Sequence, residues 1–267
     1  MISCRLTPLD AIPERPYPYK ILDIQPDDDL EAIMQVFAER TEAEPYGDTE
    51  VIRVQSPEGR RFEFTLDVWH NIGGLSRQEI MGQSSRNYEE AFRVELATEA
   101  LRGTPLVISR SMRQPTSEVP EALALRAQIE DTYGPPSKVD MNNRGGMTMI
   151  YAWGEDGFIP DLDAQPKREI TYTDRGREHT ASYQPCVNSP AYSSSVEYQF
   201  QHPRLREIMP GCVAVFRVRH SGQPGQTSIS FQITDYELAR LNMAETDRQI
   251  VQALTGEQEV NASDLDL

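Results

Sequence analysis

Cys186 and Cys212, two of the three cysteines in this chain, are the residues best suited to a specific chemical role. Cys186 lies in a stretch rich in Pro, Ser and Asn, whereas Cys212 directly follows Pro210-Gly211 and opens an expected strand. A loop and the start of a strand can meet, and a disulfide that closes this 26-residue separation would contribute roughly 3 to 4 kcal/mol in the chain-entropy model. We therefore expect a Cys186–Cys212 disulfide, with two reduced structural thiols as the alternative in the cytosol.

Nucleophilic catalysis by either cysteine is disfavoured by the surrounding residues. A reactive thiolate needs a nearby base or a helix N-terminus, and the histidine nearest in sequence is His202. The serine run 193–195 lacks the G-x-S-x-G pattern of a nucleophile elbow. We assign no catalytic residue, and these signals favour a protein that is not an enzyme.

Metal and cofactor signatures are equally weak. The four histidines form no H-x-x-x-H group, and the cysteines form no C-x-x-C group. The acidic stretch Glu155-Asp156-Gly157, which continues to Asp161 and Asp163, lacks the spacing of an EF-hand. The glycine pairs 73–74 and 145–146 lack the strand and helix context of a phosphate loop. We therefore expect no metal and no cofactor.

Aromatic side chains are the remaining candidates for a binding site. Trp69, Trp153, Tyr151 and Tyr192 fall at expected strands and loops, and aromatic rings often anchor protein partners. Packing in the core is the alternative use of the same rings. These four residues form the candidate binding surface, for which we expect a protein partner.

The charge balance limits the other partner classes. The 267-residue chain has 42 acidic and 26 basic residues, a formal net charge of −16. This field is unfavourable to phosphate backbones and anionic lipid surfaces, so we expect no nucleic-acid partner. The composition gives no oligomeric state.

The expected disulfide and the N-terminus point to different compartments. A disulfide predicts a periplasmic or secreted protein. Met1-Ile2-Ser3-Cys4 resembles the end of a bacterial lipoprotein signal, which makes Cys4 a candidate lipidation site and a lipid anchor the expected membrane contact. No run approaches the roughly 18 to 20 apolar residues of a membrane span, and the N-terminus as written lacks a signal h-region and predicts the cytoplasm.

Periodicity and turn signals predict an α+β fold with antiparallel strands. One helix follows the acids 27–29, a second runs from an N-cap at Ser117 to Gly134-Pro135-Pro136, and a third opens with a capping box at Thr234 and ends near Leu254. Expected strands are 50–54, 62–68, 92–96, 106–109, 147–153, 196–200, 212–219 and 228–233, with a loop at 71–89 and an irregular segment at 159–185.

The two halves of the chain share an order of elements: a helix, strands and a final hairpin. The hairpins 91–109 and 215–232 both have Phe-Arg-Val on the first strand and a Gly-containing turn. We expect an extended segment at 1–20, a first α+β module at 21–114, a second at 115–255 and a flexible acidic tail at 256–267. An internal duplication is one explanation of this order, and generic hairpin chemistry is the other.

The helix end at 133–136, followed by the aromatic strand 149–153, resembles helix-plus-antiparallel-sheet modules of bacterial envelope proteins. These are the outer-membrane-assembly lipoproteins and the β-lactamase-inhibitor-protein modules. The resemblance covers about residues 117–153, while Gln25-Pro26-Asp27-Asp28 departs from the Gly-Met-Thr-like turn of that family. Residues 91–136 also resemble proteobacterial secreted proteins.

The resemblance implies a binding or scaffolding role in the envelope. We therefore expect a non-enzymatic binding or assembly factor of the bacterial cell envelope. One alternative is a hydrolase with a loop-built site in residues 155–205, because long loops in compact domains are often functional. Another is a cytosolic structural subunit of a larger assembly.

Overall fold

The structure is a computed structural model that describes residues 6–41, 46–55, 59, 61–72, 90–174, 177–187, 211–223 and 225–255. Its helices are α1 (Leu30–Thr41), α3 (Ala122–Tyr133) and α5 (Tyr236–Thr255), with 3₁₀ turns η1 (Glu99–Leu101) and η2 (Thr116–Glu118). The strands are β1 (Tyr46–Gln55), β2 (Arg61–Ile72), β3 (Glu90–Leu96), β4 (Pro105–Pro115), β5 (Lys138–Met141), β6 (Met147–Gly154), β7 (Gly157–Ile159), β8 (Arg168–Asp174), β9 (Arg177–Tyr183), β10 (Cys212–Gln223) and β11 (Gln226–Asp235).

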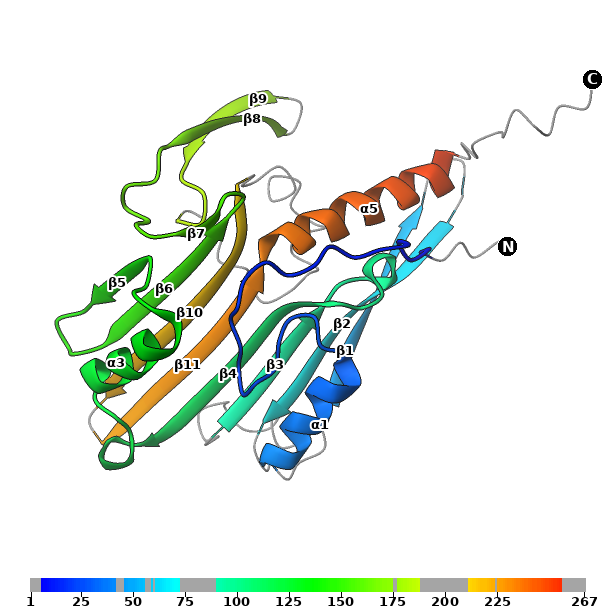
Figure 1. The fold of residues 1–267 in the computed structure, drawn as a ribbon. Helices are drawn as coiled ribbons and strands as arrows, with labels where there is room; N and C mark the ends of the chain where they lie inside the picture. Colours follow the sequence, from blue (N-terminus) through cyan, green and yellow to red (C-terminus); the bar gives the residue numbers. More distant parts are fainter. Residues whose placement is uncertain are drawn as a thin grey trace, which may run out of the picture.

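One antiparallel sheet runs through both halves of the chain (Figure 1). Its strand order is β1-β2-β3-β4-β11-β10-β6-β5, with β7 paired to β6, and β8 and β9 form a separate hairpin. Each half supplies a helix and then four strands of this order, and the halves join where β4 pairs with β11. The fold is α+β as expected. The repeated order agrees with an internal duplication, which stays a prediction.

The first face of the sheet carries α1, α3 and the N-terminal segment. Phe92 of β3 stacks on Phe37 of α1 with ring centroids 4.2 Å apart. Phe216 of β10 contacts Tyr133 of α3 at 5.4 Å and Tyr19 of the N-terminal segment at 5.3 Å. These rings belong to one core cluster, because alternate residues of each strand point to the same face.

The second face is covered at one end by α5. Val107 of β4 and Leu238 of α5 belong to one buried cluster, and Val215 of β10 and Tyr236 of α5 belong to another. Figure 1 shows α5 running along the sheet from the end of β11 towards β1 and β2. The chain reaches this position because β11 ends at Asp235, and α5 follows without an intervening loop.

The N-terminal segment is extended, as expected, and is part of the core. Tyr17 and Tyr19 are 5% and 2% exposed, and Ile21 and Ile24 belong to the same cluster. Tyr19 packs against several rings: Tyr17, Tyr133, Tyr151, Trp153 and Phe216. The burial of these side chains helps to hold the segment in place, and Arg102 donates hydrogen bonds to the carbonyl oxygens of Leu9 and Asp10.

Helix boundaries correct two of the sequence expectations. Ser117 is not a helix N-cap, because it lies in η2 and α3 begins only at Ala122. Val119 is extended (φ −111°, ψ 138°), since a residue before proline is disfavoured in the helical region, and Pro120 follows it. Asp235 caps α5 instead of Thr234, because its Oδ1 accepts the Leu238 N–H at 2.7 Å.

The segment 159–185 is more regular than expected. Residues 168–174 and 177–183 pair as the β8–β9 hairpin, with Thr171 opposite Thr180. Alternating β-branched and aromatic residues give this segment its strand propensity, which the irregular assignment overlooked. The strand expected at 196–200 and residues 73–89 of the expected loop lie outside the described residues.

Candidate functional site

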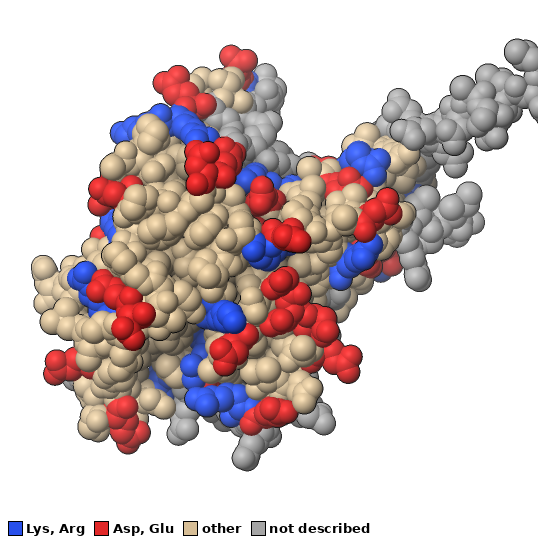
Figure 2. Space-filling view, in the orientation of Figure 1, with Lys and Arg blue, Asp and Glu red and all other residues tan. Residues whose placement is uncertain are grey.

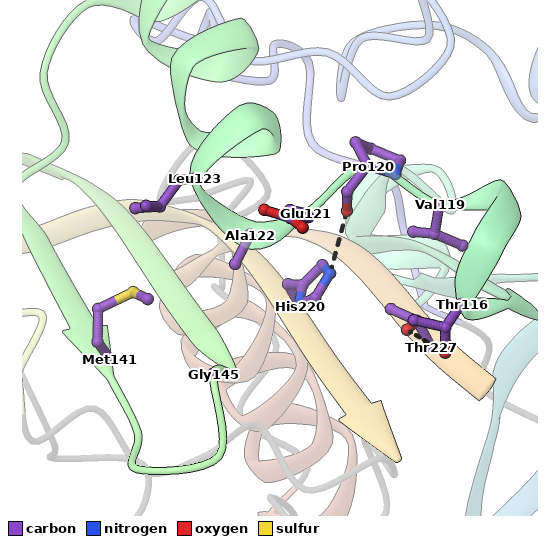
Figure 3. Close-up of a pocket in the computed structure, with 10 residues that line it drawn as sticks. All are labelled: Thr116, Val119, Pro120, Glu121, Ala122, Leu123, Met141, Gly145, His220 and Thr227. Atoms are coloured by element: carbon purple, nitrogen blue, oxygen red, sulfur yellow. Dashed lines mark hydrogen bonds between the residues drawn. The ribbon is translucent and has the colours of Figure 1, made fainter. Parts of the chain in front are cut away.

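A pocket of about 330 Å³ lies where the start of α3 crosses the ends of β10 and β11 (Figure 3). The β5–β6 turn and η2 close its two sides. Its lining residues are Thr116, Val119, Pro120, Glu121, Ala122, Leu123, Met141, Gly145, His220 and Thr227. This volume is at the lower end of small-molecule pockets and suits one inserted side chain or a small organic group.

His220 forms the polar floor of the pocket. It sits on β10 between Ile229 of β11 and Met147 of β6, and its Nε2 lies 3.2 Å from the carbonyl oxygen of Pro120. A carbonyl only accepts, so the Nε2–H donates to Pro120, and Nδ1 is an acceptor in the neutral form of the ring. Within the described part of the chain, Nδ1 is buried and has no hydrogen-bond partner.

The two threonines of the pocket satisfy each other. Thr227 Oγ1 donates to Thr116 Oγ1 at 3.2 Å, which links β11 to η2. Figure 3 shows this pair and His220 on one side of the pocket, with Leu123 and Met141 on the other. The hydroxyls are therefore engaged with each other, and the imidazole is engaged with a backbone carbonyl. This arrangement pairs neither hydroxyl with a base.

The mouth of the pocket is apolar. Leu123 of α3 is 65% exposed and Met141 of β5 is 48% exposed. The opposite side of α3 packs against the protein, since Ala122 and Leu125 are buried. Large apolar side chains exposed on both sides of one pocket are typical of a binding site for an apolar group.

Sequence reasoning missed this pocket, although one signal was available. The expected apolar face of the second helix consists of Ala122, Leu125, Ile129 and Tyr133. Leu123 is apolar but lies off that face, so helical geometry alone leaves it exposed. No local pattern reveals that Met141 and His220 would lie beside Leu123, because they belong to strands β5 and β10, which follow α3 in the chain.

The Cys186–Cys212 disulfide is present, as expected. The two Cα atoms are 5.1 Å apart, and both residues are buried beside Ala152, Leu162 and Tyr236. The bond attaches the turn after β9 to the first residue of β10. It stands apart from the pocket, which lies towards the other end of β10 at His220.

The expected aromatic surface is corrected for one of its members. Tyr151 is 0% exposed, and its hydroxyl donates to the carbonyl of Gly134 at 2.8 Å, so it is a core residue. It lies on the face of β6 that α3 and Tyr19 cover. Trp153 is half-buried and packs against Tyr19 and Phe158.

The other candidates cannot be placed on a surface by the structure. The backbone of Trp69 belongs to β2, opposite Val94 of β3. Tyr192 and Cys4 lie outside the described residues. The binding surface and the lipid anchor therefore stay predictions at these positions.

Glu95 is a buried carboxyl outside the pocket. It lies on β3 opposite Val107 and is 3% exposed, with Oε1 3.0 Å from Arg93 Nη2. Its other oxygen is buried and has no hydrogen-bond partner within the described residues. Burial raises its pKa from 4.5 to about 7, although the Arg93 guanidinium opposes this shift.

No protein-family model, no curated protein and no solved structure matches the chain. Within the described residues, no group of three or more His, Cys, Asp or Glu side chains could hold a metal ion. Among the same residues, no helix combines the length and apolar composition that a bilayer span requires.

Proposed function

We propose that this protein is a non-enzymatic binding or assembly factor whose pocket receives an apolar side chain of a protein partner. The exposure of Leu123 and Met141 on two sides of one pocket is the observation that carries the proposal. An inserted aliphatic or aromatic side chain would bury both, beside the His220 ring that lines the pocket.

The surroundings of the pocket support a protein ligand. Figure 2 shows acidic and basic side chains side by side on the face that carries α1 and α3, with a broad uncharged area around β6 and β7. An apolar pocket within a mixed polar surface has the composition of a protein-interface anchor site with a polar rim.

The bacterial envelope remains the proposed location. A buried disulfide between Cys186 and Cys212 is compatible with an oxidising compartment outside the cytoplasm. The loop-built hydrolase and the cytosolic subunit stay predictions, and no contact within the described residues favours either one.

Site-specific photo-crosslinking tests the proposal. A photoreactive residue at position 123 should crosslink a partner protein in the native host, whereas the same residue at Val251 of α5 should not. Val251 is a matched control because it is 56% exposed on another helix, away from the pocket.

Charge insertion into the pocket then measures its contribution to affinity. Leu123→Asp and Met141→Asp should each weaken binding of the captured partner by about tenfold or more, as expected for residues that line an anchor pocket. Val251→Asp should bind as the wild type does. Equal affinity for the wild type and both pocket variants would refute a role for the pocket.

A further inference from the structure

The second face of the sheet contains a half that α5 does not cover. Val215, Arg217, Arg219 and Ser221 alternate along β10 on the face opposite Phe216. Val215 is buried beside Tyr236 of α5, Arg217 is half-buried, and Arg219 and Ser221 are exposed. Helix α5 therefore covers this face only as far as Val215, and Arg219 and Ser221 beyond it are exposed.

On the β11 side, the strand register places neutral polar side chains beside the two arginines, whereas on the β6 side Arg217 lies opposite Ile150 and Arg219 opposite Thr148. Arg217 lies opposite Gln232 of β11, which lies opposite Ser109 of β4. In the next row, Arg219 lies opposite Ser230, which lies opposite Ser111. We call this set the arginine face; its members are Arg217, Arg219, Gln232, Ser230, Ser109 and Ser111. Gln232 and Ser230 lie on β11, one strand spacing of about 4.8 Å from β10. Ser109 and Ser111 lie one strand further away, on β4.

Arg217 and Arg219 have no acidic partner within the described residues. Elsewhere in that part of the chain, arginines pair with acids, as in Arg110–Glu90 at 2.5 Å and Arg126–Glu130 at 2.7 Å. Burial lowers the pKa of the Arg219 guanidinium, and the neighbouring charge of Arg217 lowers it further.

Two neighbouring arginines that lack an acidic partner among the described residues are unexpected in so acidic a protein. The sequence has 42 acidic and 26 basic residues, so carboxylates outnumber the cations with which they could pair. Two like charges on one face of a strand repel each other and cost stability unless a ligand supplies the opposite charge. In the other direction from β10, the row of Arg219 continues through Thr148 of β6 to Asp140 of β5, at the edge of the sheet. The Asp140 carboxylate there lies 3.7 Å from Lys138 Nζ.

We propose that the arginine face binds a short acidic segment of a partner protein. Carboxylates of that segment would pair with the guanidinium groups of Arg217 and Arg219, and the serine hydroxyls and the Gln232 amide would donate further hydrogen bonds. An extended polyanion is a poorer occupant, because the net charge of −16 on the protein repels the part of the polyanion that extends beyond the arginine face. A short acidic segment experiences mainly the local field of the two arginines.

This proposal is independent of the pocket. His220 follows Arg219 on β10 and therefore faces the opposite side of the sheet. A single partner would have to reach both faces to occupy both sites. The two sites can be tested separately for this reason.

A hexaglutamate peptide is a suitable probe, with hexaglutamine as its uncharged control. The intact protein should bind fluorescently labelled hexaglutamate saturably at low salt, and high salt should weaken the binding. Arg217→Gln and Arg219→Gln should each lower the affinity by about tenfold, equivalent to about 1.4 kcal/mol. Arg53→Gln removes a 72% exposed arginine from β1 and should leave the affinity unchanged.

Stability provides a second measurement. Arg219→Gln relieves repulsion with Arg217, so it should unfold at the same or a higher urea concentration than the wild type. A loss of hexaglutamate binding then reflects the lost charge and not misfolding.

Any one of the following results would overturn the proposal. The first is hexaglutamate binding that Arg217→Gln and Arg219→Gln leave intact, or no binding by the wild type. The second is equal or tighter binding of a DNA oligonucleotide at the same face. The third is a dimer in sedimentation that Arg219→Gln dissociates, because it would identify a second copy of the chain as the occupant.

Discussion

Tyr17 Oη donates a hydrogen bond of 2.8 Å to Asp235 Oδ2, which lies 218 residues further along the chain. The other carboxylate oxygen of Asp235 caps α5 through the Leu238 N–H, and Arg15 Nε lies 3.4 Å from Oδ2. Asp235 is 1% exposed, so its burial raises its pKa, while Arg15, Leu238 and Tyr17 all oppose this shift. One buried carboxylate thus connects the N-terminal segment to the start of α5.

Removing the Tyr17 hydroxyl should weaken this connection. Tyr17→Phe keeps the ring packed against Tyr19 but leaves a buried carboxylate oxygen without this donor, so we expect a loss of about 1 to 3 kcal/mol in the free energy of unfolding. Urea unfolding measures the change. Tyr133→Phe is the control, because the Tyr133 hydroxyl forms exposed bonds to the backbone of Lys20, and it should cost less. Equal effects of the two variants would contradict this account of Asp235.

Loss of the disulfide should lower stability through the unfolded chain. The double variant Cys186→Ala with Cys212→Ala should lose about 3 to 4 kcal/mol, because the bond closes 26 residues of chain. Urea unfolding with and without a reductant should show the same loss in the wild type. Cys4→Ser should retain the sensitivity to reductant. Mass spectrometry of unreduced peptides that finds free thiols at positions 186 and 212 would show that the bond does not form.

Glu95 should make stability depend on pH between about 4.5 and 7. In the unfolded chain the carboxyl loses its proton near 4.5, whereas in the folded protein it keeps the proton until about pH 7. The folded state binds more protons in this interval, so this contribution to stability is complete below pH 4.5 and is lost as the pH rises through 7. The difference between these two pKa values corresponds to roughly 3 kcal/mol for this buried group.

The variant Glu95→Gln isolates that contribution, because glutamine does not ionise. Its free energy of unfolding, minus that of the wild type at the same pH, should increase by roughly 3 kcal/mol between pH 4.5 and pH 8. The comparison is needed because burial also raises the pKa of Asp235. A difference that stays constant over this range would show that Glu95 ionises at its ordinary pKa.

Replacing Gly134, at the end of α3, should lower the stability of the protein more than replacing Gly222 in β10. It follows α3 with φ 77° and ψ −170°, a conformation that is essentially restricted to glycine. No atom lies within 4 Å of an added Cβ, so Gly134→Ala measures backbone strain alone, and we expect a loss of about 1 to 3 kcal/mol. Gly222→Ala on β10 is the control, because its φ is not positive and its nearest neighbour atom is 3.9 Å away. Thermal unfolding should separate the two variants.

The local elements were largely predictable. The stop signal Gly134-Pro135-Pro136 ends α3 as expected, and the Phe-Arg-Val strands become β3 and β10. Periodicity and turn chemistry depend on neighbours within a few residues, which the sequence displays directly. The errors occur where signals compete, as at Pro120, where a proline that favours a helix start also forces Val119 to be extended.

The candidate sites were much less predictable. The disulfide could be anticipated because cysteines are few and their chemistry is specific. The pocket brings together Leu123, Met141 and His220 from three elements, and the arginine face depends on the register of β10 with β11 and β4. Tyr151, placed on a surface by its position in an aromatic strand, is covered by α3 and Tyr19.

By itself, the sequence determined the α+β class, most helices and strands, and the cysteines able to form a disulfide. Tertiary structure alone decided that β4 pairs with β11 to make one sheet, and that Tyr17 reaches Asp235. It also decided that Arg217 and Arg219 lie beyond the cover of α5. The physical reason is range: propensity and capping act between near neighbours, whereas strand pairing, burial and charge neighbourhoods depend on residues far apart in the chain.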